Sequence, residues 1–263
     1  HGVNRYTTCI SPALGGSGNP SACTAHGVLV AIEAALEAEG RSLSGVSVAV
    51  QGVGNVGGPL VRMLLDRNVG RVVASDSVAS RVEAAKEEFG DRVEVSLVPA
   101  GDNSVLFEDV DVVAPCAFGG VLNDDTIPRI KARIVCGAAN NQLAQVHHAE
   151  ALTAAGKVYV PDFLANRMGI VQCANEQYGR VGSLGSLEDP LIRSHLTRDS
   201  PDGIFQVTQR VLKYAAEKGV TTDQAARDLA DAKAAEPHPI FGHRTAEVVK
   251  SLVEDGWHNQ KQV

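Results

Sequence analysis

The chain has 263 residues, and its 24 Lys and Arg against 31 Asp and Glu leave a formal net charge of −7 at pH 7. A chain of this length forms one large domain or two small ones, and its acidic balance provides no basic field for holding nucleic acid or an anionic membrane. We therefore expect neither of these among its partners. The first residue is His1 rather than Met, so we also expect the chain to be part of a longer protein.

Residues 1–20 are expected to form a loop that ends in a glycine-rich run. A helix follows over residues 21–39, and from there to residue 160 short apolar strands alternate with helices or turns. The strands are predicted at residues 46–51, 71–75, 93–97, 110–114, 133–136 and 158–160, with helices at 56–67 and 79–89. This alternation is typical of an α/β fold, here a doubly wound, mostly parallel Rossmann-type sheet with helices on both faces.

Helices dominate after Pro161, where no further strand is predicted. Residues 179–201 are rich in Gly, Ser and Pro, which is typical of a loop or hinge. Three helices are predicted at 203–217, 222–235 and 244–254, the second with an N-terminal cap at residues 221–223. The apolar stretches stay below the roughly 18 residues that span a bilayer, so no membrane helix and no signal peptide are predicted.

The cysteines and histidines show no ligand pattern. The cysteines form no CxxC pair, which favours reduced thiols in a cytoplasmic protein over a disulfide framework. They are Cys9, Cys23, Cys116, Cys136 and Cys173. His147 and His148 are expected on a surface helix without an acidic or thiol partner at ligand spacing, so no metal site is predicted. His26 is expected to be a satisfied, partly buried histidine.

A GxGxxG motif follows the first predicted strand directly and opens the next helix. Gly52 permits a tight turn, Gly54 lets the backbone approach a pyrophosphate, and Gly57 lets the helix pack closely on the strand. With Asn55 and Val56, these residues bring the N–H groups of a helix N-terminus to the phosphates. Residues 1–178 are therefore predicted to be a dinucleotide-binding domain, followed over 179–263 by a hinge loop and a helical segment.

Asp76 lies at the end of the second predicted strand, 24 positions after Gly52. A carboxylate there binds the adenosine ribose hydroxyls and repels a 2′-phosphate, so the predicted cofactor is NAD rather than NADP. Two alternatives stay open from the sequence. Asp76 could merely cap the helix that begins near Val78, and Arg81 could contact a 2′-phosphate instead of facing solvent.

Four further motifs occur in order between residues 10 and 179. They are Gly15-Gly-Ser-Gly-Asn-Pro-Ser21 with Thr24-Ala25, Ala114-Pro-Cys-Ala-Phe-Gly-Gly120 with Asn123-Asp124, Gly137-Ala-Ala-Asn-Asn-Gln-Leu143, and Tyr159-Val-Pro-Asp162 with Asn166. Each resembles a motif of the leucine, valine and phenylalanine dehydrogenase branch of the amino-acid dehydrogenases. The set is more specific than the glycine loop by itself.

The resemblance implies positions for the cofactor. Cys116 and Ala117 would lie under the adenosine side of NAD, with Cys116 as a packing residue rather than a nucleophile. Ala139 and Asn140 would approach the nicotinamide ribose, and Thr24 would approach the carboxamide. For Asn140 and its neighbour, a simple turn is the alternative.

The resemblance also places Asn166 and Gly169 near an amino-acid substrate. Family members usually have Asn-Ala-Gly-Gly at this point, whereas this chain has Asn-Arg-Met-Gly over residues 166–169. Arg167 and Met168 are expected to crowd or recharge that space, which puts the choice of substrate in doubt. Arg167 either pairs with a substrate carboxylate or points to solvent.

The catalytic residues of such enzymes have no counterpart that can be located here. In the family, a preceding substrate domain carries a lysine that assists attack of water on the imino acid and an aspartate that handles protons on the amino group. None of Lys86, Lys131, Lys157 or Lys213 lies in a matching context. No catalytic residue is predicted, and these groups are expected from a missing N-terminal domain or a partner chain.

The predicted activity is the reversible, NAD-dependent oxidative deamination of an apolar L-amino acid to its 2-oxo acid and ammonia, in a homo-oligomer. This chain would supply the cofactor-binding part. One alternative is a non-catalytic NAD-binding or regulatory module, and another is an NAD-dependent oxidoreductase acting on a different amine or imine. An upstream coding sequence with a glycine-rich lysine segment would distinguish the enzyme from the module.

Overall fold

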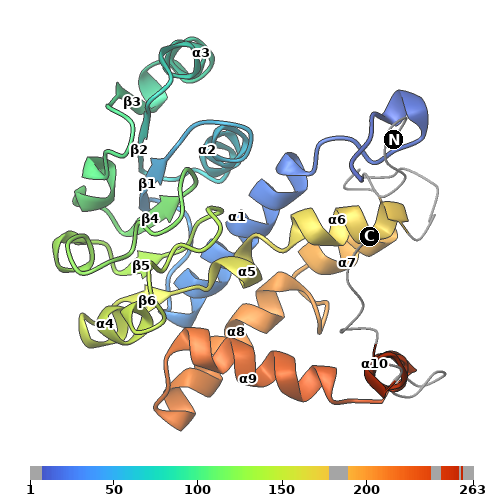
Figure 1. Cartoon of the computed structure of the whole chain (residues 1–263). Coiled ribbons are helices and arrows are strands. Elements are labelled where there is room, and N and C mark those ends of the chain that lie inside the picture. Colours follow the sequence, from blue (N-terminus) through green and yellow to red (C-terminus); the bar gives the residue numbers. More distant parts are fainter. Residues whose placement is uncertain (1–7, 178–188, 238–243, 255, 257–263) are drawn as a thin grey trace. The chain divides into compact units, whose positions relative to one another are not determined.

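The structure, a computed structural model, describes residues 8–177, 189–237, 244–254 and 256. Its centre is a parallel sheet with the strand order β3-β2-β1-β4-β5-β6 (Figure 1). The strands are β1 (Ser47–Gln51), β2 (Arg71–Asp76), β3 (Glu94–Leu97), β4 (Val112–Pro115), β5 (Ile134–Val135) and β6 (Val158–Tyr159). The predicted Rossmann-type α/β fold is confirmed, and every pairing between described strands is parallel.

The order of the strands reverses between β1 and β4. Gln51, the last residue of β1, pairs with Ser75 of β2 and with Pro115 of β4. The carboxyl ends of these three strands therefore meet at one edge of the sheet. In open α/β sheets this is the point at which ligands bind.

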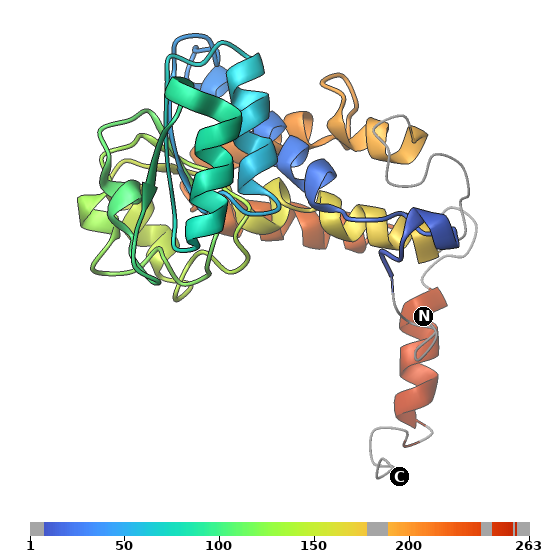
Figure 2. The same cartoon turned by 90° about the horizontal axis from the view of Figure 1, so that it is seen from above.

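Three long helices lie on one face of the sheet, and 3-10 turns together with the short helix α4 (His148–Ala154) contribute to an apolar cluster on the other. Figures 1 and 2 show α1 (Ser21–Ala38), α2 (Gly57–Asp66) and α3 (Ala79–Phe89) on the same side. On the opposite side, the 3-10 helices η3 (Ser104–Phe107) and η4 (Ile127–Arg129) contribute to a buried apolar cluster. Because side chains alternate along a strand, Ala49, Val73, Val113 and Val135 face this cluster while their neighbours face the helices.

The remaining α-helices come after β5 in the sequence, and the first of them, α4, precedes β6. They are α4 (His148–Ala154), α5 (Asp162–Ala165), α6 (Met168–Gln177), α7 (Pro190–Leu196), α8 (Ile204–Lys218), α9 (Thr222–Ala234) and α10 (Arg244–Glu254), and the 3-10 helices η1 (Pro12–Leu14) and η2 (Gly90–Arg92) also occur. The predicted cap of α9 is present, since the Gln224 N–H donates to Thr221 Oγ1 at 3.1 Å.

Helix α1 is the long core helix of the fold. By length and composition alone it is apolar enough to cross a membrane, which the sequence analysis did not anticipate. Within the structure 67% of that window is buried, and the helix packs against α2, α6 and α8. Core packing therefore accounts for its apolar length.

Of the loop or hinge predicted over residues 179–201, residues 179–188 lie outside the described residues, and the rest is partly wrong because Pro190–Leu196 forms α7. Asp189 caps this helix, and its carboxylate accepts hydrogen bonds from the Leu191 and Ile192 N–H groups. Pro190 occupies the first helical position, where its missing N–H costs nothing. An Asp-Pro pair is a start signal that outweighs the loop-like composition around it.

Contacts divide the chain into two compact units, residues 1–226 and 227–263. The first holds the sheet, α1 to α8 and the beginning of α9. The second holds the rest of α9 and α10, whose Val248, Val249, Leu252 and Val253 are exposed. The boundary predicted after residue 178 lies outside the described residues.

Candidate functional site

The carboxyl ends of β1, β2 and β4 enclose a cleft of about 250 Å³. It lies where the strand order reverses, as expected for a ligand site in such a sheet. Predicted cofactor residues from three separate loops line it. These residues are Gly52, Gly54, Asn55, Val56, Asp76, Cys116 and Ala117.

Each of the three motif glycines occupies its position for a different geometric reason. Gly52 has a φ of 89°, which disfavours any residue with a side chain. A Cβ on Gly57 would collide with the Gly52 carbonyl oxygen, so close packing of α2 on the turn requires glycine. A Cβ on Gly54 would meet only the Arg81 guanidinium, 3.4 Å away. Gly54 thus leaves its backbone open toward the cleft.

Asp76 is buried at the end of β2 and binds two backbone groups. Its Oδ2 accepts from the Val53 N–H at 2.9 Å, and its Oδ1 accepts from the Val78 N–H at 2.9 Å. The bond to Val78 lies ahead of α3, whose N-cap residue is Val78 and has no side-chain cap hydrogen bond, so Asp76 does not cap the first turn of this helix. The same carboxylate lines the cleft and holds the glycine loop. Since a carboxylate accepts about four hydrogen bonds, it retains capacity for ribose hydroxyls.

Arg81 also lines the cleft, which the sequence analysis gave only as an alternative. Its Nη1 lies 3.8 Å from Asp76 Oδ2, and its side chain is 53% exposed. The guanidinium is therefore both a neighbour of the carboxylate and free to reorient.

Cys116 behaves as a packing residue in this site. Burial raises the pKa of its thiol to about 12, against a weaker opposing effect of the Ala138 backbone N–H. A thiol with this pKa is protonated at neutral pH and is a poor nucleophile. Its backbone N–H donates to the Gln51 carbonyl, which ties the loop after β4 to the end of β1.

A second group of predicted residues lies where α1, α6 and the loop after β5 meet. The Asn166 amide donates to the Ala138 carbonyl at 3.0 Å and to Asn140 Oδ1 at 2.8 Å. Thr24 is nearly buried, and a Cβ on Gly169 would lie 3.4 Å from its Oγ1. Thus Asn140 and Asn166 are in direct contact, and Thr24 lies against Gly169. Ala139, whose N–H donates to the Pro115 carbonyl, connects this group to β4.

The crowding expected from Met168 is wrong, because its side chain is fully buried and packs under α1. It would be 2.9 Å from a Cβ on Gly27, which shows that it fills the core between helices. The Arg167 guanidinium instead donates to the Asp202 carbonyl. Burial lowers the pKa of Arg167 to about 10, partly offset by Asp202. Met168 begins α6, whereas Arg167 lies in the turn between α5 and α6, and its guanidinium takes neither of the two expected arrangements.

His26 is partly buried, as expected, but it is not satisfied. Its Nδ1 has no hydrogen-bond partner among the described residues, and burial, with Arg67, lowers its pKa.

The sequence analysis missed residues that complete the wall of the cleft. Ser77, Asp102 and Phe118 line it, and Phe118 is 58% exposed. Phe118 lies inside the Ala114–Gly120 motif, which could have indicated that it lines the cleft. Asp102 follows β3 without a motif, and only the sheet order brings it to the site.

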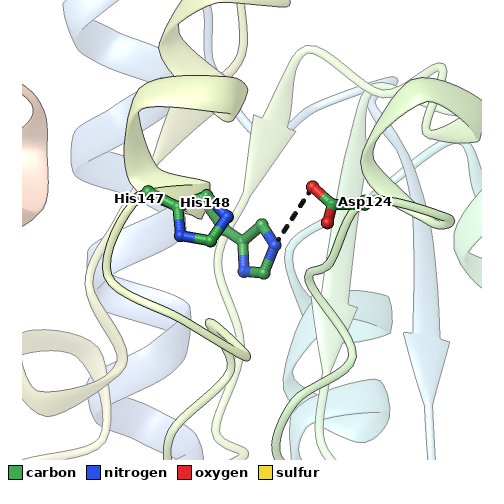
Figure 3. Close-up of side chains that lie close together, drawn as sticks. All are labelled: Asp124, His147 and His148. Atoms are coloured by element: carbon green, nitrogen blue, oxygen red, sulfur yellow. Dashed lines mark ion pairs between the residues drawn. The ribbon is translucent and has the colours of Figure 1, made fainter.

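The fold also brings together residues from separate parts of the sequence. Among the described residues, one group could hold a metal ion, and it consists of Asp124, His147 and His148 (Figure 3). Their ligand atoms lie within 4.8 Å of one another. His148 is buried rather than exposed on a surface helix, and its Nε2 lies 3.3 Å from Asp124 Oδ1. Sequence spacing gave no sign of this acidic partner.

The hydrogen bonding of His148 disfavours a metal at this group. Its Nδ1 accepts from the Gln145 N–H at 2.9 Å, so the neutral ring carries its proton on Nε2, the atom that faces Asp124. A metal on Nε2 would move that proton to Nδ1, opposite another N–H donor. The absence of a metal site stays a prediction.

Comparison with known proteins identifies the family. Residues 15–238 match the family model described as Glutamate/Leucine/Phenylalanine/Valine dehydrogenase. The chain belongs to this family. It is 36% identical over 233 residues to leucine dehydrogenase from Bacillus subtilis (strain 168), covering 88% of this chain and 59% of that relative. The chain thus spans about three fifths of the length of this relative.

Solved structures agree with this assignment. L-tryptophan dehydrogenase from Nostoc punctiforme is similar with a TM-score of 0.70 and 36% identity, over 81% of this chain and 59% of that one. A hetero-hexameric glutamate dehydrogenase from Thermus thermophilus is similar with a TM-score of 0.63 and 26% identity, over 83% of this chain and 53% of that one. Both support the Rossmann-type architecture.

Proposed function

We propose that this chain is the NAD-binding part of an amino-acid dehydrogenase. The proposed reaction is the reversible oxidative deamination of an apolar L-amino acid to its 2-oxo acid and ammonia. The observation that carries the proposal is the cleft at the reversal of strand order, with the glycine loop and Asp76, in a member of the Glutamate/Leucine/Phenylalanine/Valine dehydrogenase family.

The residues of the cleft, together with the second group at Thr24 and Asn140, fit a dinucleotide in three parts. Asp76 would bind the adenosine ribose, and the backbone of residues 54–57 at the start of α2 would bind the pyrophosphate. Thr24 and Asn140 would lie toward the nicotinamide end. NAD, when bound, supplies the acceptor for the hydride.

NAD rather than NADP is proposed because the Asp76 carboxylate is fixed by two backbone N–H groups. A fixed negative charge cannot withdraw from a 2′-phosphate, so it disfavours NADP. Arg81 is the opposing feature, because its half-exposed guanidinium lies in the same cleft. The balance of these two residues sets the choice of cofactor.

The substrate side is proposed to lie beside Gly169 and Thr24, next to the pair Asn140–Asn166. Gly169 has no side chain and Met168 is buried in the core, so neither residue places a side chain at the proposed substrate position. No lysine lines the described cleft. Acid–base groups for the amino group are therefore proposed to come from outside this chain.

The relatives named leucine and L-tryptophan dehydrogenase favour an apolar amino acid as the substrate. We further propose a homo-oligomer in the cytoplasm. The free cysteines support the location, and the hetero-hexameric assembly stated for one similar structure supports an oligomer. Light scattering on the complete protein tests the assembly.

Calorimetry with NAD and NADP tests cofactor binding on the 263-residue chain, and NADH absorbance tests the reaction on the complete protein with leucine, valine, phenylalanine and tryptophan. We expect NAD to bind more tightly, and turnover in the complete protein but not in the chain by itself. Binding without turnover in the complete protein would favour a non-catalytic module. Failure to bind either dinucleotide would refute the proposal.

A further inference from the structure

Two cysteines that are 164 positions apart in the sequence meet beside α6. The Sγ atoms of Cys9 and Cys173 lie 2.9 Å apart. The sequence analysis treated them as separate reduced thiols, because spacing gave no indication that they are neighbours. A disulfide bond has a length of about 2.05 Å, so the two sulfurs need to approach by less than an ångström.

The surrounding residues hold Cys9 in this position. Its N–H donates to the Glu176 carboxylate at 3.0 Å, and the Ser17 N–H donates to the same carboxylate at 2.7 Å. The Gln172 amide donates to the Ser17 carbonyl at 2.9 Å. Residues 9–18, which lead into α1, are thus bound to α6 on both sides of the thiol pair.

Mutual contact and solvent access together distinguish this pair. Cys9, Cys173 and Cys116 are half-buried, whereas Cys23 and Cys136 are buried, and of the half-buried thiols Cys9 and Cys173 contact each other. Burial, followed by the contact with Cys173, raises the pKa of the Cys9 thiol to about 11. The Cys9 thiol is therefore mostly protonated at neutral pH.

We propose that Cys9 and Cys173 are a modification site at which a reversible disulfide forms by exchange with a low-molecular-weight disulfide such as oxidised glutathione. One cysteine thiolate attacks the glutathione disulfide, forms a mixed disulfide and releases one glutathione thiolate. The other cysteine thiolate attacks the protein sulfur of the mixed disulfide and releases the second glutathione. Two electrons pass from the protein to glutathione, and the two thiol protons end on the two glutathione thiols.

The disulfide would attach residues 9–18, which lead into α1, covalently to α6. Thr24 of α1 lies against Gly169 of α6, so the cross-link fixes the spacing of the two helices that border the space beside Gly169. This consequence for substrate access rests on the proposed function. Formation of the disulfide does not rest on the proposed function, and its test needs no measurement of enzyme activity.

The test is incubation of the 263-residue chain in glutathione buffers from fully reduced to fully oxidised, followed by alkylation and mass spectrometry. We expect the oxidised chain to lose two alkylatable thiols and two hydrogen atoms in mass. Trypsin leaves Cys9 and Cys23 on one peptide, residues 6–41, and Cys173 on another, residues 168–180. A Cys23→Ala variant, which should still form the bond, therefore assigns the cross-link to Cys9.

Cys9→Ser and Cys173→Ser should each abolish the cross-link. Oxidation should raise the melting temperature of the wild-type chain by about 5 °C or more, because the bond closes a long loop in the unfolded state, and should leave both serine variants unchanged. Five alkylatable thiols in fully oxidised glutathione, or separate glutathione adducts on Cys9 and Cys173, would overturn the proposal. The thiol count on the wild-type chain decides the matter even if a serine variant does not fold.

Discussion

The Asp76 carboxylate accepts a hydrogen bond from the Val53 N–H at 2.9 Å, which ties the end of β2 to the glycine loop after β1. One side chain thus shapes the loop for the pyrophosphate and presents a negative charge for the ribose. A residue with this double role should affect both folding and cofactor choice.

We expect Asp76→Asn to weaken NAD binding by about 10- to 100-fold, because hydrogen bonds to a charged group contribute about 1.5–3 kcal/mol. The preference for NAD over NADP should shrink or reverse, since Arg81 then has no opposing charge. Calorimetry with both cofactors measures this, with Asp91→Asn on the exposed η2 as the control. An unchanged NAD to NADP ratio would remove Asp76 from the ribose site.

Gly57→Ala and Gly54→Ala should affect different properties, the first the stability of the fold and the second the affinity for NAD. A methyl group on Gly57 meets the Gly52 carbonyl, so we expect a loss of about 2 kcal/mol or more in unfolding free energy. A methyl group on Gly54 meets only Arg81, so stability should be kept while NAD affinity falls about tenfold. Denaturant unfolding and calorimetry separate the two effects. Equal destabilisation by both substitutions would contradict this assignment of roles.

Lowering the pH should release residues 9–18 from α6. Partial burial raises the pKa of Glu176, but hydrogen bonds from Ser17, Ile10 and Cys9 outweigh it and hold the pKa below its usual value of 4.5. A carboxyl with a depressed folded-state pKa contributes stability above about pH 4.5, and this contribution is lost as the pH falls through the folded-state pKa.

Melting temperatures between about pH 6 and pH 3 check this linkage. Glu176→Gln should have a lower melting temperature at pH 6 and a shallower fall than the wild type. Glu87→Gln, on the exposed side of α3, should follow the wild-type curve. Parallel curves for wild type and Glu176→Gln would show that this carboxylate does not couple to folding.

Zinc should not stabilise the chain through Asp124, His147 and His148. The proton on His148 Nε2 and the N–H donor at Nδ1 oppose coordination. A true site would add about 2.7 kcal/mol of stability at a free zinc concentration 100 times its dissociation constant, which thermal unfolding detects. A zinc-dependent rise in melting temperature that disappears in His147→Ala would prove this expectation wrong.

The strands, the glycine loop and Asp76 could be predicted because their sequence signals are local. The glycine loop directly follows β1, and Asp76 ends β2, so spacing along the chain fixes their relation once a parallel sheet is assumed. The observed helix Ala79–Phe89 has the predicted bounds. The hydrogen bond between Asp76 and the loop itself was absent from the sequence pattern.

What could not be predicted depends on contacts between distant segments. His148 became buried and acquired Asp124 as a neighbour through packing of the loop after β4, which no spacing shows. Met168 was expected near the substrate because of its position in a motif, yet its side chain is buried against Gly27. The Cys9–Cys173 contact joins chain positions whose separation exceeds the length of any local signal.

The attachment of residues 9–18 to Glu176 has a consequence for the folding order. Its contacts join residues 159 to 167 positions apart, and forming them early would cost the chain entropy of closing a long loop. We therefore expect them to form only after the intervening sheet and α6. The strand pairings of the described sheet lie between residues 47 and 159 and do not include this segment. We therefore expect residues 9–18 to dock last and to detach first, as a sub-global opening whose amides exchange with solvent while the sheet stays protected.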